Sequence, residues 1–261
     1  MRPAGALLGL VLLSGCSTHP ITGRDQILAL PAVQAVRAEL SFAFSASAQR
    51  SDASIACERD CVSSEGLAAF AGRVAASGAQ LQRAARDMTP DLFTRIGNFQ
   101  FEINDTLGVG TGSSAGGRIV LGAGLAGLEP TDTVIAFLVA REMAHVIARH
   151  AEEDAGASIV FSVLGMLLPG FSAVARLVAS SLGSSVLTGS WAAQQQREAD
   201  DIAIALLEQT GMPARIAALE LAIGINRARL PEDEWGARYL ESARRVEAIA
   251  ASPPRYAVIG N

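Results

Sequence analysis

Hydrophobic and polar residues follow two different periods along this chain. A period of about 3.6 residues predicts helices over 32–48, 65–86, 194–209, 214–227 and 234–250. A period of two, in which Phe99, Phe101 and Ile103 alternate with polar residues, predicts a half-buried strand. The Gly/Ser-rich stretch 108–117 predicts a loop, and the run 118–121 predicts a second short strand. We therefore expect an α+β fold that is mostly helical and has a small sheet.

A further helix is predicted to begin at Thr131, because threonine is a good N-cap and Asp132 would lie in the first turn. Apolar residues recur at helical spacing behind this cap, and Arg141 and His145 lie on the same stripe. Both side chains should therefore face inward. A charged group on a buried stripe needs a partner.

Two apolar stretches, 157–168 and 171–187, are separated by Pro169 and Gly170. Each is too short or too interrupted to span a bilayer. Core helices and a membrane-facing hairpin both fit this pattern. No internal repeat is present, and 261 residues of which 50% are hydrophobic suffice for one compact domain.

The N-terminus has the pattern of a lipoprotein signal. Met1 and Arg2 are followed by the apolar run 4–13 and by Leu-Ser-Gly-Cys, a lipobox that ends at Cys16. We expect a signal peptide over 1–15, a lipidated tether and connector over 16–30, and one domain over 31–261. Acyl chains such as palmitate on Cys16 would anchor the chain to a membrane. Ser17 after the cysteine indicates the periplasmic face of the outer membrane in the bacterial cell envelope.

Two cysteines remain besides Cys16. In an oxidising compartment Cys57 and Cys61 predict a small disulfide, with two free thiols on neighbouring helical turns as the alternative. The 21 basic and 26 acidic residues give no basic patch, which makes nucleic acid an unfavourable partner.

Residues 141–145, Arg-Glu-Met-Ala-His, are one substitution away from the zinc motif H-E-x-x-H. In that motif two histidines one turn apart bind Zn²⁺, and the glutamate is the general base for the metal-bound water. Arg141 stands at the first histidine. A guanidinium has no lone pair and stays protonated, so it cannot be a ligand.

Four stretches, in the same order and distributed over nearly the whole mature chain, resemble metallopeptidase family 48. This gluzincin family includes the CAAX prenyl endopeptidase, the heat-shock protease HtpX and periplasmic lipoprotein proteases. Pro20–Ile27 is similar to N-P-V-T-G-R-x-Q-L, and Gly116–Leu125 is similar to P-G-G-x-I-x-V-x-x-G-L. Glu142–His150 is similar to E-x-x-H-V-x-A-R-H, and Gln196–Asp200 is similar to E-x-E-A-D. The resemblance implies a gluzincin-like domain with a small sheet at the edge of its cleft.

This chain departs from the family where the zinc ligands should be. Besides Arg141, Gln196 stands where the family has its third ligand, a glutamate, and Glu198 is turned about 200° away from it on a helix. The region 239–245 lacks the histidine of a family segment. His145 and His150 are expected to diverge by about 140°, and His19 lies beside the tether.

Other roles are therefore expected for the retained residues. Glu142 should be an ion-pair partner, and His145 a hydrogen-bonded core histidine. His150, near the end of the helix, should cap carbonyl groups or face solvent. Asp200, which adjoins the ligands in the family, should hold Arg141, with Gln196 as a neutral acceptor nearby.

We expect a pseudoprotease without a cofactor that acts as a chaperone, adaptor or scaffold in envelope protein quality control, with unfolded or outer-membrane proteins as partners. One alternative is an active metalloendopeptidase with an altered zinc site that uses His145, Glu142 and an unidentified carboxylate. Another is a helical lipoprotein in which the motif is accidental.

Overall fold

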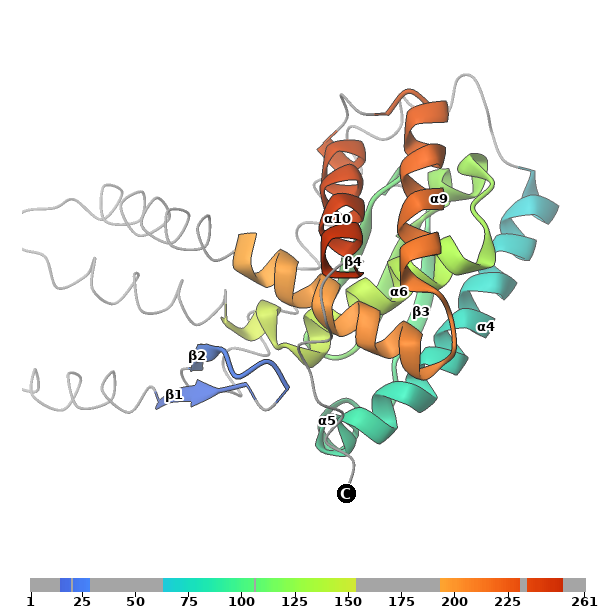
Figure 1. Ribbon diagram of the computed structural model, residues 1–261. Helices are drawn as coiled ribbons and strands as arrows, with labels where there is room; N and C mark the ends of the chain where they lie inside the picture. Colours follow the sequence, from blue (N-terminus) through green and yellow to red (C-terminus); the bar gives the residue numbers. More distant parts are fainter. Residues whose placement is uncertain are drawn as a thin grey trace, which may run out of the picture.

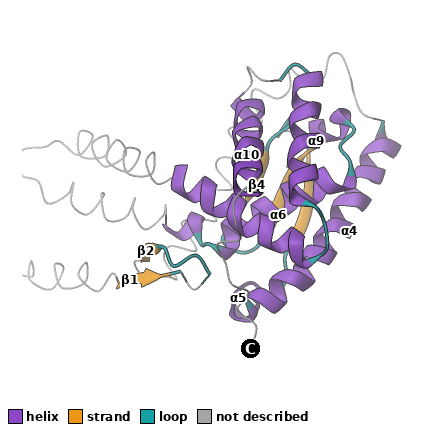
Figure 2. Ribbon diagram, in the orientation of Figure 1, coloured by secondary structure: helices purple, strands orange, loops and turns teal. Residues whose placement is uncertain are grey.

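The computed structural model describes residues 15–19, 21–28, 63–105, 107–153, 193–230 and 234–250. In this part the chain forms a mostly helical α+β domain (Figures 1 and 2). Its labelled helices are α4 (Ser64–Met88), α5 (Pro90–Ile96), the 3-10 helix η2 (Ala123–Leu128), α6 (Asp132–Ile147), α9 (Ala214–Arg227) and α10 (Glu234–Ala250). A short helix over 150–153 and a longer helix over 193–209 lie between α6 and α9 in the sequence.

The five predicted helices that fall on described residues are confirmed, with ends shifted by at most a few residues. The helix over 32–48, the cysteines 57 and 61, the apolar stretches 157–187 and the signal peptide before residue 15 lie outside the described residues. No described helix has both the length and the apolar character needed to cross a membrane.

Helix α6 is the centre of the domain. Its cap is the predicted one, because the Thr131 side chain accepts a hydrogen bond from the backbone N–H of Val134. Every residue from Val134 to Ile147 except His145 is buried. The helix is therefore buried all round and not along one stripe, since α4, α9 and the sheet pack against different sides of it.

The sheet consists of β3 (Gln100–Asn104), β4 (Thr111–Ser113) and β5 (Arg118–Gly122) in the order β3-β5-β4. β3 is parallel to β5, and β4 is antiparallel to it. The predictions of β3 and β5 are confirmed. The prediction of a loop over 108–117 is wrong for β4, a three-residue Thr-Gly-Ser strand that sequence alone does not favour and that pairing with β5 and packing on α6 stabilise.

Close packing of glycines holds β4 beside β5. The N–H of Gly122 donates to Gly110 at 2.8 Å, and the N–H of Gly124 donates to Gly108 at 2.9 Å. A Cβ atom on Gly122 would lie 2.1 Å from the carbonyl oxygen of Gly108. Only glycine allows the two backbones to approach this closely.

The stretch expected as a connector is a β-hairpin. β1 (Gly15–Thr18) and β2 (Asp25–Leu28) are antiparallel, with Cys16 opposite Ile27. The turn between them contains Gly23 at a φ of 68°, a left-handed conformation that glycine adopts without strain. The hairpin lies against the C-terminal end of α6 and the N-terminal half of helix 193–209 (Figure 1).

Candidate functional site

An ion pair joins α6 to helix 193–209 at the motif. The Nε atom of Arg141 donates to Oδ1 of Asp200 at 3.0 Å, and both side chains are buried. The prediction that Asp200 holds Arg141 is confirmed. A guanidinium therefore links the two helices that carry the zinc-motif positions of the resemblance.

Asp200 also binds α10. Its Oδ1 accepts a hydrogen bond from Ser242 at 2.5 Å, and its Oδ2 accepts one from Arg245 at 2.6 Å. Asp200 is fully buried, so these partners compensate the loss of its hydration. Neither Ser242 nor Arg245 was predicted as a partner from the sequence, although their spacing of three places them on one helix face.

Glu142 connects α6 to the sheet. Its two carboxylate oxygens accept hydrogen bonds from Thr111 at 2.7 Å and Ser113 at 3.0 Å, and Nη1 of Arg141 lies 3.7 Å from Oε1. The expected ion pair is confirmed. The two hydroxyl partners could not be foreseen, because they lie on β4, which was not predicted.

Gln196 does not accept from Arg141 as the sequence led us to expect. Its Oε1 atom is buried and has no hydrogen-bond partner within the described part of the chain. This amide oxygen stands one helical turn before Asp200, at the position of the third ligand in the resemblance. It is thus a polar atom left without compensation.

Zinc, which the resemblance implies, does not fit these residues. At the first ligand position there is a cation that is bonded to Asp200, and at the third an amide replaces a carboxylate. No three His, Cys, Asp or Glu side chains of the described residues are grouped so that they could hold a metal ion. No chemical step through zinc follows from this arrangement.

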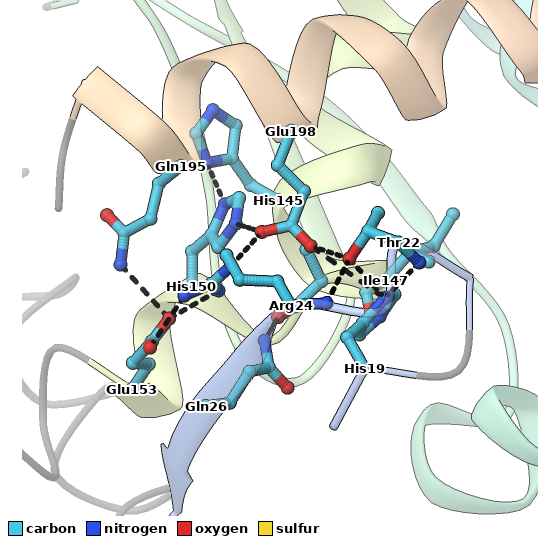
Figure 3. Close-up of polar contacts among 11 residues, drawn as sticks. His19, Thr22, Arg24, Gln26, His145, Ile147, His150, Glu153, Gln195 and Glu198 are labelled. Atoms are coloured by element: carbon cyan, nitrogen blue, oxygen red, sulfur yellow. Dashed lines mark hydrogen bonds and ion pairs between the residues drawn. The ribbon is translucent and has the colours of Figure 1, made fainter. Parts of the chain in front are cut away.

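A second polar cluster lies at the C-terminal end of α6 (Figure 3). The Nδ1 atoms of His145 and His150 are 2.8 Å apart, so one ring donates a hydrogen bond to the other. The expected divergence of these residues is wrong. α6 ends at Ile147, and Arg149 has a φ of 61°, which turns the chain so that His150 folds back on His145.

His150 is buried, and its Nε2 atom lies 3.0 Å from Oε2 of Glu198. The expectation that it caps carbonyl groups or faces solvent is therefore wrong. His145 is hydrogen-bonded, as expected, but it is half-buried and not a core residue. Burial, His150 and the charge of Arg141 lower the pKa of His145 well below its ordinary value, which keeps the ring neutral near neutral pH.

Glu198 accepts from the hairpin as well as from His150. Thr22 and the Nε atom of Arg24 both donate to its carboxylate. Burial alone would raise its pKa, but the hydrogen bonds from His150 and Thr22 and the charges of His150 and Arg24 lower the pKa of Glu198 to about 2. Glu198 thus belongs to this second cluster and not to the Arg141–Asp200 pair.

Arg24 also forms a bidentate ion pair with Glu153, in which Nη1 donates to Oε1 at 2.8 Å and Nη2 donates to Oε2 at 2.6 Å. His19, expected only beside a tether, is buried, and its Nε2 atom donates to the carbonyl oxygen of Ile147 at 3.1 Å. Gln26 donates to the carbonyl oxygen of Ala148. The sequence contained one indication of these contacts, because the stretch Pro20–Ile27, which resembles a family motif, is rich in polar residues.

We predict that Glu198→Gln changes the response to acid. Because the pKa of Glu198 is lowered from 4.5 to about 2 in the folded protein, its ionised form stabilises the fold above about pH 4.5, and this contribution is lost as the pH falls towards 2. The variant should be less stable than the wild type at neutral pH and should lose less stability on acidification. Thermal unfolding across this pH range measures the difference.

Glu208→Gln, on the exposed side of the same helix, is the matched control and should leave the acid response unchanged. Parallel stability curves for Glu198→Gln and the wild type would show that the cluster does not hold Glu198 in its ionised form.

No model of a known protein family matches the sequence of this chain, and no curated protein matches it. The likeness to metallopeptidase family 48 consequently consists of the motif residues and their order in the chain.

Proposed function

We propose that this chain is a lipid-anchored envelope protein with a gluzincin-like fold that has lost peptide hydrolysis and acts as a chaperone, adaptor or scaffold. The observation that carries this proposal is the buried pair of Arg141 and Asp200. It joins the motif helix to helix 193–209 through a direct contact between the two side chains.

The chemistry of the retained residues supports a non-hydrolytic role. A metalloprotease needs a metal to lower the pKa of water and to polarise the peptide carbonyl. The glutamate of the motif, Glu142, has instead both oxygens occupied by hydroxyl groups of β4. Here it fastens the sheet to α6, which is a structural task.

The arrangement of the elements supports the fold in this proposal. The sheet β3-β5-β4 lies beside the motif helix α6, and the stretch that resembles the cleft-edge strand of the family includes β5. Helix 193–209, with the stretch similar to E-x-E-A-D, meets α6 at the motif. The polar links at these junctions join the sheet, α6 and helix 193–209 through side chains of the domain itself.

We expect the purified full-length protein to contain no stoichiometric zinc and to leave casein uncut, because two of the three ligand positions hold Arg141 and Gln196. Elemental analysis and a casein digestion assay test both expectations. Cleavage that stops on addition of a chelator, and that Glu142→Gln abolishes, would instead establish the altered-site enzyme. Mass analysis of the Cys16 peptide tests the lipid anchor.

A further inference from the structure

The hairpin is fastened to the domain by side chains that are largely buried. The contacts of His19, Thr22, Arg24 and Gln26, here called the hairpin latch, reach two separate parts of the chain (Figure 3). These are the C-terminal end of α6 with the short helix after it, and helix 193–209.

The charged part of the hairpin latch is shielded from water. The side chain of Arg24 is 10% exposed, and those of Glu153 and Glu198 are 2% and 4% exposed. Buried ion pairs are screened by salt far less than surface pairs. The hairpin should therefore stay docked over a wide range of ionic strength. Removing one partner of a pair would leave an uncompensated buried charge.

The latch lies very close to the residue expected to carry lipid. Cys16 is in β1, and His19, which is buried, follows three residues later. Three residues of extended chain span at most about 10 Å. An acylated Cys16 would therefore hold the folded domain within about this distance of the lipid headgroups, with no free tether between them.

We propose that the hairpin and the adjacent start of helix 193–209 form the membrane-facing surface of the domain, with a phospholipid bilayer as the partner. This inference rests on the lipid anchor in the proposed function. Thr18 and Asp25, which are polar, are exposed there, so the surface rests on the headgroups and does not enter the hydrocarbon. The hairpin latch fixes the orientation of the domain on the membrane.

The orientation is tested on the full-length, acylated protein in vesicles of phosphatidylethanolamine and phosphatidylglycerol that contain lipids with a nitroxide headgroup. A fluorescent amino acid replaces either Gln194, which is exposed beside the latch, or Ala68, which is exposed in α4. The start of α4 and the hairpin lie on opposite sides of the molecule (Figure 1). We expect stronger quenching at position 194 than at position 68.

Arg24→Ala removes the ionic part of the latch and should abolish most of this difference while acylation is unchanged. Arg73→Ala is the matched control, because it removes an arginine that pairs with Asp132 on the exposed surface, and it should keep the difference. Hydrogen exchange at residues 19–24 should become faster in Arg24→Ala alone. A second variant, Thr22→Val, keeps the charges and should reduce the difference less.

Equal quenching at positions 194 and 68 in the acylated wild type would overturn the orientation while leaving the lipoprotein assignment intact. A difference that survives in Arg24→Ala, with exchange at residues 19–24 accelerated, would overturn the role of the latch. A Cys16 peptide without acyl chains would overturn both the anchor and the inference built on it.

Discussion

The double variant Arg141→His with Gln196→Glu is expected to bind stoichiometric zinc, which neither single variant should do. The spacing of the ligand positions on the two helices supports this expectation. Arg141 and His145 are one turn apart on α6, and Gln196 and Asp200 are one turn apart on helix 193–209. Position 196 lies on the same face of helix 193–209 as Asp200, which contacts Arg141. Position 196 is therefore directed towards the next turn of α6.

The double variant should also fold. Asp200 would lose Arg141 but would keep Ser242 and Arg245, so its carboxylate would not be left without partners. His145 would offer its Nε2 atom, because its Nδ1 atom contacts His150. At position 196 a carboxylate would replace the amide whose Oε1 atom is buried without a partner among the described residues.

Isothermal titration with zinc, together with elemental analysis after dialysis, measures this gain. The two single variants are the controls, since each lacks one of the three protein ligands that catalytic zinc requires. A folded double variant that takes up no zinc would show that these positions do not form the ligand geometry of the resemblance.

Arg141→Ala is expected to destabilise the fold by about 3 kcal/mol, because removing one member of a buried ion pair leaves the other charge partly uncompensated. Arg141 is 5% exposed and Asp200 is 0% exposed, so water cannot replace the lost contact. Glu142 loses its nearby cation as well, at 3.7 Å. Arg245 still pairs with Asp200, which keeps the loss at the lower end for buried pairs.

Urea unfolding of the wild type and the variant measures the change in the free energy of unfolding. Arg73→Ala again serves as a control, because its ion pair with Asp132 is exposed and should contribute less than about 1 kcal/mol. Equal losses in the two variants would mean that the Arg141 pair is no more important than a surface contact.

Sequence reasoning succeeded where a local pattern determined the outcome. The Thr131 cap, the helical period behind it and the buried position of Arg141 were read from neighbouring residues, and a buried cation required an acid. Asp200 was identified because it stands one turn from Gln196 in a recognisable helix motif. The mostly helical α+β class followed from the two hydrophobic periods.

Contacts that depend on chain reversal or on distant segments were not predictable in this way. The turn at Arg149 has a positive φ in a residue other than glycine. The residue types at the turn therefore did not predict that His150 would contact His145. Arg24 pairs with Glu198 across 174 positions of sequence. β4 is only three residues long, and its pairing with β5, more than its own composition, makes it a strand.

A double-mutant cycle on Arg141 and Asp200 most directly tests whether an ion pair now joins the two helices of the motif. It compares the unfolding free energies of the wild type, Arg141→Ala, Asp200→Ala and the protein with both changes. We predict a coupling energy of about 2 kcal/mol, because the two side chains meet in a buried site. A coupling energy below about 0.5 kcal/mol, the value for independent sites, would contradict the pairing.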